Sequence, residues 1–260
     1  MLRIMSFNIW GDYFGNPVEE REDGIGKVIS DNSPDILALQ EATRSWHASK
    51  LFTELKNVYA FVEPETAPEP NYVPLLYRKD RFSLLESGFI RFYDTPDQSK
   101  GSTWGVFEDL TSRNKVAVFC THFWWKYQGE LSHDLLRVSN AALLTDKALE
   151  ITARYDIPAV ALGDLNSPWK LPTLDYLRAA GWKLAQSEAP ESSGVSTHHG
   201  DPVRGEDGRY HGRRTSDDYT KSLDHIVCRG SISPVKFSVI EDQTALDVSD
   251  HSPIYSDFEL

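Results

Sequence analysis

Short polar inserts follow apolar, β-branched runs at six places along the sequence. They are Phe7-Asn8-Ile9, Leu39-Gln40-Glu41, Thr121-His122-Phe123, Gly163-Asp164-Leu165-Asn166, Leu223-Asp224-His225-Ile226 and Ser249-Asp250-His251. A short apolar run is typical of a buried strand, so each insert is expected at the mouth of a strand. One such insert is common in turns, but six in a single chain are hard to attribute to turns alone. The pattern predicts strands whose ends together form an active site.

The same runs alternate with helical patterns early in the chain and with hairpin-like patterns later. We expect strands at residues 3–8, 36–40, 75–77, 82–92, 104–110, 115–121, 158–163, 223–228, 235–241 and 254–258. We expect helices at 19–30, 45–56 and 131–155, and loops at 63–74 and 94–102. This order favours two mixed sheets packed together with helices outside them. The predicted fold is therefore α+β, a four-layer αββα sandwich, with residues 1–260 as one catalytic domain.

Composition narrows the class of protein. No run of apolar residues is long enough to span a membrane, and the first residues lack the apolar region of a signal peptide, so we expect a cytoplasmic protein. Cys120 and Cys228 lie in apolar strand-like runs and are expected to be buried, reduced thiols. A net charge of −12 disfavours loose binding to nucleic acid, although it does not exclude a nuclease. We expect a monomer.

Several of the inserts carry oxygen ligands of the kind that hard cations prefer. Glu41 directly follows an apolar strand, where a Mg²⁺ ligand would sit, although an acid that begins a helix is an equal alternative. Asn8 at the end of the first strand has the same two interpretations. Asp164 and Asn166 are two residues apart, so on a continuing strand they share a face and can orient a water and a phosphate oxygen, although the same residues favour turns.

Taken in order, the inserts resemble the motif series of the endonuclease/exonuclease/phosphatase superfamily, which includes exonuclease III-like and pancreatic deoxyribonuclease-like enzymes. The similarity runs from the first predicted strand to the last. It implies metal-dependent hydrolysis of a phosphate ester on a two-sheet sandwich. By position, Glu41 resembles the principal ligand of Mg²⁺ or Mn²⁺, with Asn8 and Asp250 near it.

The resemblance also implies roles for the other polar residues. Asp164 matches the residue that orients or deprotonates the attacking water, and Asn166 matches its partner on the phosphate. His251 matches the catalytic imidazole, and Asp224 the carboxylate that orients it. His122 matches a second histidine that contacts the phosphate or assists the leaving group. Whether Asp164 or His251 is the base stays open.

The sequence departs from the family pattern at two positions. Trp10 stands where some nucleases of the family carry an acidic residue, so that ligand is absent. His225 follows Asp224 where many members have tyrosine, a variation also seen in the family. Neither departure removes a catalytic group.

Two segments are candidates for substrate binding. Trp124 and Trp125 follow His122 directly and could stack on a base, a sugar or a headgroup, although one of them could instead pack under the sheet rim. His198 and Arg213 lie in a Gly-rich stretch in which phosphate-binding arginines are expected.

Charge favours a compact substrate over a long duplex. Between residues 195 and 221, five basic residues are balanced by five acidic ones, and the chain has no basic arm. The first hypothesis is a Mg²⁺-dependent phosphatase or phosphodiesterase that acts on a small or headgroup-like phosphate ester. The second is a nuclease or DNA-repair phosphodiesterase. The third, a silent binding module, is disfavoured because such a module has no need of the complete catalytic set.

Overall fold

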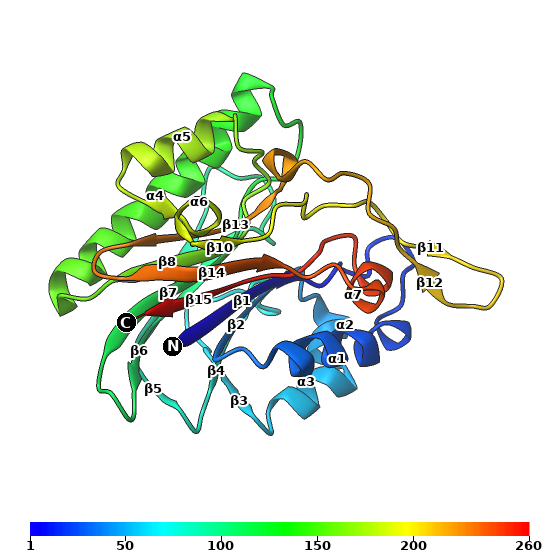
Figure 1. Ribbon diagram of the computed structural model, residues 1–260, viewed down its shortest axis with the longest axis horizontal. Helices are drawn as coiled ribbons and strands as arrows, with labels where there is room; N and C mark the ends of the chain where they lie inside the picture. The colour runs from blue at the N-terminus through cyan, green and yellow to red at the C-terminus, as the bar shows by residue number, and fades with distance from the viewer. Residues whose placement is uncertain (260) are drawn as a thin grey trace.

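Two β-sheets face each other in the computed structural model, which describes residues 1–259 (Figure 1). The first sheet has seven strands in the order β10 (Glu191–Ser192), β14 (Ser233–Val239), β15 (Ile254–Glu259), β1 (Leu2–Asn8), β2 (Ile36–Gln40), β4 (Leu75–Arg78) and β3 (Tyr59–Phe61). The second has six in the order β5 (Phe82–Arg91), β6 (Gly101–Asp109), β7 (Lys115–His122), β8 (Ala159–Asp164), β13 (Asp224–Arg229) and β9 (Lys183–Leu184). Both sheets are mixed, as predicted.

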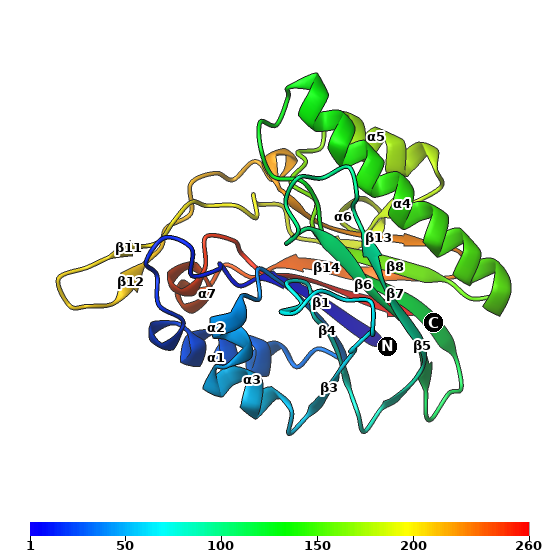
Figure 2. The ribbon, with the colours of Figure 1, turned by 180° about the vertical axis from the view of Figure 1, so that it is seen from behind.

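Helices cover the outer faces of both sheets. The helices are α1 (Glu22–Asn32), α2 (Arg44–His47), α3 (Lys50–Leu55), α4 (Leu131–Tyr155), α5 (Pro172–Ala179), α6 (Ala185–Glu188) and α7 (Gln243–Val248), with 3-10 turns η1 (Val18–Glu20) and η2 (Tyr219–Lys221). Helices α4 and α5 lie on the six-stranded sheet and α1 to α3 on the other side of the molecule (Figures 1 and 2). The predicted αββα arrangement is confirmed.

Alternating side chains explain why both faces of the central strands are apolar. In β1, Leu2 and Ile4 pack between the sheets, whereas Met5 and Phe7 pack against the helices. Strand β7 divides its side chains in the same way between the core under α4 and the core between the sheets. Successive residues of a strand point to opposite faces, so a strand buried on both sides has a continuous apolar sequence.

Local capping accounts for the main difference between the predicted and observed helices. The expected helix at 45–56 is two short helices, because the Ser49 hydroxyl accepts a hydrogen bond from the Phe52 amide (3.2 Å) and begins α3 as a new helix. The helix expected at 19–30 begins later, at Glu22, after the turn η1. The short strands β3, β9 and β10 and helices α5, α6 and α7 were not predicted.

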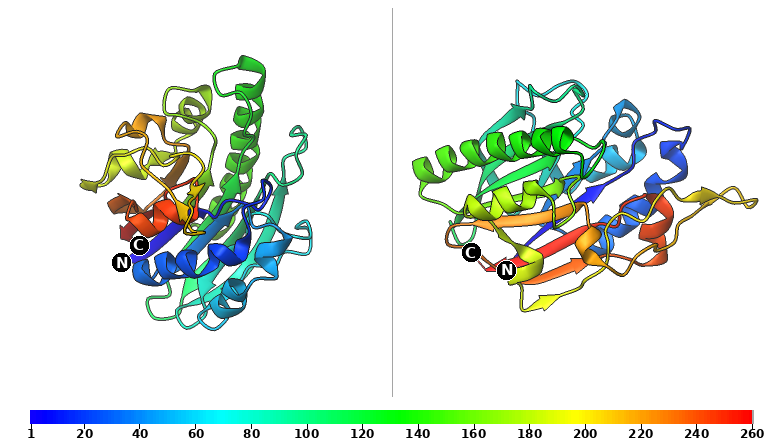
Figure 3. Two further views of the ribbon diagram at one scale, coloured as in Figure 1. Left: turned by 90° about the vertical axis from the view of Figure 1, so that its right-hand side faces the viewer. Right: turned by 90° about the horizontal axis from the view of Figure 1, so that it is seen from above.

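Other features agree with the sequence or add to it. Cys120 and Cys228 are buried free thiols, as predicted. No helix among residues 1–259 is both long and apolar enough to cross a membrane. A small hairpin, β11 (Val203–Arg204) and β12 (Tyr210–His211), extends away from the layers, and the two ends of the chain lie side by side on β1 and β15 (Figure 3).

Gly163 is the last residue before Asp164 and lies opposite Thr121 on the parallel strand β7. Its φ is +149°, and a Cβ at this position would lie 1.8 Å from the carbonyl oxygen of Thr121. A side chain here would therefore push β7 and β8 apart directly beside Asp164.

We expect Gly163→Ala to lower the free energy of unfolding by at least about 3 kcal/mol, from backbone strain and overpacking together. Gly181→Ala is the matched control, because Gly181 has φ +87° but open space around its Cβ position, and it should cost about 1 kcal/mol. Urea unfolding of both variants measures the difference. Equal losses in the two variants would contradict the close approach at Gly163.

Candidate active site

Strand ends from both sheets bring the predicted residues together. Strands β1 and β2 are parallel and end at Asn8 and Gln40, so Glu41 follows directly beside Asn8. Strands β7 and β8 are parallel as well, with His122 opposite Asp164. Strand β13 is antiparallel to β8 and begins at Asp224, also opposite Asp164. All these side chains therefore lie at one edge of the sandwich.

Asp164 is at the centre of the group. Its Oδ2 lies 3.2 Å from Asn8 Nδ2, 3.3 Å from His122 Nε2 and 3.8 Å from His251 Nε2, and its Oδ1 accepts from the Asn166 amide at 2.8 Å. Burial alone would raise the pKa of this carboxyl, but His251 and His122 outweigh burial and hold the pKa below its usual range. Asp164 is therefore a carboxylate at neutral pH.

His251 is held by a chain of hydrogen bonds on its other side. Its Nδ1 lies 2.7 Å from Asp224 Oδ2, which also accepts from the Thr197 hydroxyl at 2.7 Å. Burial works to lower the pKa of His251, but the carboxylates of Asp224, Asp250 and Asp164 raise it well above the usual value. The arrangement favours an imidazolium whose Nε2–H faces Asp164.

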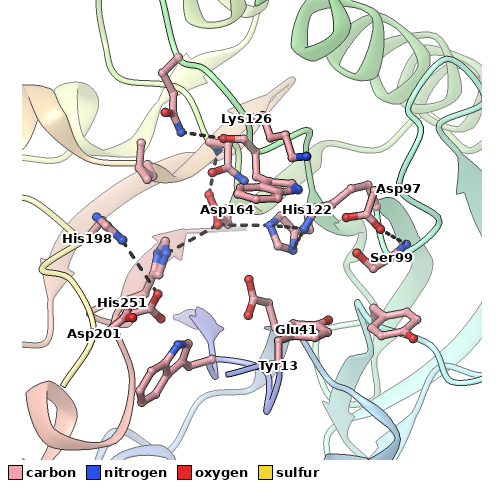
Figure 4. A pocket seen from close by; sticks show the side chains of 18 of the residues that line it. Tyr13, Glu41, Asp97, Ser99, His122, Lys126, Asp164, His198, Asp201 and His251 are labelled. Atoms are coloured by element: carbon pink, nitrogen blue, oxygen red, sulfur yellow. Dashed lines mark hydrogen bonds and ion pairs between the residues drawn. The ribbon is translucent and has the colours of Figure 1, made fainter. Parts of the chain in front are cut away.

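Glu41 faces this group from the other sheet, across the open centre of the site (Figure 4). Its two oxygens accept from Asn8 Nδ2 at 3.3 Å and from the Gly11 amide at 2.8 Å. Burial raises the pKa of the nearby Asp250 to about 7, with Glu41 and Asp201 adding to the effect and His251 opposing it. Burial and the neighbouring carboxylates together thus disfavour the charged form of Asp250.

Buried Arg21 fixes the segment that surrounds Glu41. Its guanidinium donates to the carbonyl oxygens of Ile9, Trp10, Asn16 and Val248 at 2.7 to 3.2 Å, and only 1% of the residue is exposed. It joins the loop after β1 to the segment that leads to Asp250. The sequence analysis did not identify this residue, because its acceptors are backbone groups distant in sequence.

Lys100 is a further residue that the sequence analysis missed. It lies in the expected loop at 94–102, just before β6, and its Nζ is 2.9 Å from His122 Nε2. Burial lowers the pKa of Lys100, while Glu41, Asp97 and Asp164 oppose that effect. No periodicity or motif marks a lysine in such a loop, so only the folded chain reveals it.

The site opens into a cleft of about 1450 Å³. Its lining includes the predicted residues Glu41, His122, Asp164, Asn166, Asp250, His251, Trp125 and His198, together with Trp10, Tyr13, Phe14, Tyr72, Asp97, Lys100, Lys126, Tyr127, Asp201 and Lys221. Asn8 and Asp224 lie behind this lining and contact Asp164 and His251. Aromatic side chains thus stand on both sides of an acidic and imidazole floor.

Two of the predicted substrate contacts lie outside the cleft lining. Trp124 is buried, and its Nε1 donates to His133 at 2.8 Å, so it packs under the rim while its neighbour Trp125 is 46% exposed in the cleft. Arg213 is exposed and does not line the cleft, because its segment leads toward α7. The two tryptophans separate because consecutive residues point in different directions.

The two departures from the family pattern have structural explanations. His225 is fully buried, with Nε2 2.9 Å from the Ser167 carbonyl oxygen and Nδ1 3.1 Å from Gln186 Nε2, so it supports the loop after Asp164. Trp10 has a positive φ of 54° and its ring packs on the guanidinium of Arg21. It forms part of the cleft wall beside Glu41.

Comparison with known proteins identifies the family that the sequence motifs resemble. A family model described as the Endonuclease/Exonuclease/phosphatase family matches residues 5–251. No curated protein matches the chain in sequence.

Solved structures are similar over the entire chain. An endonuclease/exonuclease/phosphatase from Bacteroides vulgatus has a TM-score of 0.81 at 23% identity, covering 100% of this chain and 98% of that one. A mannosyl-6-phosphatase from Bacteroides thetaiotaomicron has a TM-score of 0.77 at 19% identity, covering 100% of both chains. TDP2 from D. rerio, in complex with a single-strand DNA product, has a TM-score of 0.72 at 17% identity, covering 100% of this chain and 99% of that one. At these identities the likeness establishes the fold.

The contact between Asp224 and His251 gives a test of the site's electrostatics. We expect Asp224→Asn to lower the pKa of His251, because the hydrogen-bonded carboxylate is the largest of the charges that raise it. Titration of the imidazole resonances by NMR measures the change. Asp207→Asn is the matched control, since Asp207 contacts only the exposed His211 ring among the histidines. An unchanged pKa of His251 would show that the carboxylates of Asp250 and Asp164 keep it raised instead.

Proposed function

The chain belongs to the endonuclease/exonuclease/phosphatase family, whose members hydrolyse phosphate esters, and from that premise we propose a Mg²⁺-dependent phosphoesterase of small substrates. The observation that carries the proposal is the Asp164 carboxylate, held by Asn8 from the opposite sheet and lying within 3.8 Å of two imidazoles. Such a group can hold a water and a phosphate at the same place.

The residues around Glu41 fit a divalent metal. Glu41, Asp250 and the side-chain oxygen of Asn8 are the hard oxygen donors that Mg²⁺ and Mn²⁺ take. Burial, together with the charges of Glu41 and Asp201, raises the pKa of Asp250 to about 7, and a bound cation would favour its charged form. When bound, the metal supplies positive charge that stabilises the phosphate oxygens during hydrolysis.

The protein's own groups orient the reactants. Asp164 is an acceptor for the attacking water, which positions its lone pair toward phosphorus in line with the leaving group. His251, as an imidazolium held by Asp224, compensates the negative charge on the phosphate. His122 and Asn166 contribute further donors to the phosphate oxygens or the leaving group. Positioned charge is the main need of phosphoryl transfer, since little covalent chemistry is required of the protein.

The charged and aromatic residues that line the cleft favour a small substrate. Asp97, Asp201 and Glu69 line it and would repel a long polyanion, in keeping with the net charge of −12. Trp125 and Tyr127 on one side offer ring faces that suit a sugar or a base. The similar structure from Bacteroides thetaiotaomicron is a mannosyl-6-phosphatase, which makes a sugar phosphate the first candidate to test.

The proposal is tested with p-nitrophenyl phosphate, bis-p-nitrophenyl phosphate, mannose 6-phosphate, single-stranded DNA and duplex DNA in the presence of Mg²⁺. We expect turnover of the small esters and a loss of about 10² to 10³ in kcat for His251→Ala, typical of removing one group that stabilises charge in the transition state. Activity of that variant within about tenfold of the parent would contradict its role. Cleavage of DNA alone, lost in the variant, would make the protein a nuclease.

Glu41→Gln tests the metal site directly. We expect it to weaken Mg²⁺ binding by about tenfold or more in calorimetric titration, because one of two carboxylate ligands becomes neutral. Removal of the metal with EDTA should abolish turnover, and added Mg²⁺ should restore it. Glu19→Gln, at an exposed glutamate, is the control and should leave the titration unchanged. An unchanged titration for Glu41→Gln would remove Glu41 from the ligand set.

A further inference from the structure

Lys100 is a buried cation in the cleft that the proposed reaction does not use. It is only 7% exposed, yet it lines the cleft together with His122 and Asp164. It is delivered by the segment between β5 and β6, which also contributes Asp97 and Ser99 to the wall. The ammonium therefore lies at the inner side of the site, beside the reacting groups and away from the rim.

The hydrogen-bonding capacity of this ammonium is largely unused. A lysine ammonium has three donors, and within residues 1–259 the acceptor that Lys100 Nζ meets is the His122 ring, at 2.9 Å from Nε2 and 3.3 Å from Nδ1. No carboxylate of the described chain lies within 4.0 Å of it in an ion pair. Glu41, Asp97 and Asp164 act on it only through longer-range attraction.

His122 cannot satisfy all of its neighbours at once. Its Nε2 is 2.9 Å from Lys100 Nζ and 3.3 Å from Asp164 Oδ2. One ring nitrogen donates or accepts, so when Nε2 donates to Asp164 it cannot accept from Lys100. In that state the buried ammonium keeps only the longer contact to His122 Nδ1, at 3.3 Å, and leaving its other donors unpaired is unfavourable. An anionic oxygen in the cleft would supply the missing acceptor.

We propose that Lys100 selects phosphate monoesters, by binding the non-bridging oxygen that a monoester has and a diester lacks. The assignment rests on the proposed phosphoesterase function and specifies its substrate class. A monoester dianion presents three non-bridging oxygens and nearly two charges, whereas a diester presents two oxygens and one charge. A diester must place a carbon substituent near the position of the third oxygen, where it would desolvate the ammonium without accepting a hydrogen bond.

A general structural role is the alternative for Lys100. In that role its charge would only offset Glu41 and Asp164, and its loss would affect every substrate to the same extent. The monoester assignment instead requires that the loss depend on the number of phosphate oxygens. The ratio of the two activities separates the two roles, because effects on folding or metal binding cancel in it.

The experiment compares kcat/KM for p-nitrophenyl phosphate and bis-p-nitrophenyl phosphate, with Mg²⁺, in the parent protein, Lys100→Met and Lys183→Met. We expect the parent to prefer the monoester. Lys100→Met should lower monoester turnover by about 100-fold, as for removal of one donor to a developing oxyanion, and diester turnover by less than about fivefold. Inhibition by inorganic phosphate should weaken in the same variant. Lys183→Met, at an exposed lysine of β9 outside the cleft lining, should leave kcat/KM for both esters nearly unchanged.

Equal losses for both esters in Lys100→Met, no loss, or a parent that prefers the diester would each overturn the assignment while leaving the proposed function intact. A parent that hydrolyses neither ester would overturn the proposed function and this assignment with it. Thermal unfolding checks that the variants fold. If Lys100→Met does not fold, Lys100→Gln removes the charge but keeps a polar side chain. The same greater loss of monoester than of diester turnover is expected of it.

Discussion

The structure depends on face-to-face packing of two sheets whose strands end at the same edge. The apolar faces between the sheets exclude water, and at the edge of this core the Asn8 amide donates to Asp164 across the interface at 3.2 Å. A second polar contact, from the Cys120 thiol to the Leu39 carbonyl oxygen at 3.2 Å, crosses the interface two residues before His122 and Glu41. The distance between Glu41 and the imidazoles is thus set by how closely the sheets pack.

This packing of the sheets brings several charged side chains together in one buried site. The pKa of Asp164 is held low because two imidazoles face it, whereas that of Asp250 rises to about 7 because burial, Glu41 and Asp201 oppose its charge. A cation relieves the second carboxylate, and an anion relieves Lys100. Asp250 and Lys100 line the same cleft, an arrangement that would complement the proposed metal and phosphate.

The strands and the residues at their ends could be predicted because each signal is local. A strand buried on both faces has a continuous apolar sequence, and a polar side chain directly after it lies at the sheet edge whatever the rest of the chain does. Asn8, Glu41, His122 and Asp164 follow this rule. The helices were less certain, because a single side chain such as Ser49 can begin a new helix within one amphipathic run.

The sequence by itself determined the long strands of both sheets, the polar residues that end them, and the family to which their order belongs. The tertiary structure decided which loop residues reach the site. Lys100 and Arg21 lie in segments without periodicity, and their partners are distant in sequence. Trp124 and Trp125 are neighbours in sequence, but only the packed rim buries the first and exposes the second. Long-range contacts of this kind follow from how whole sheets and loops pack, and no short stretch of sequence encodes them.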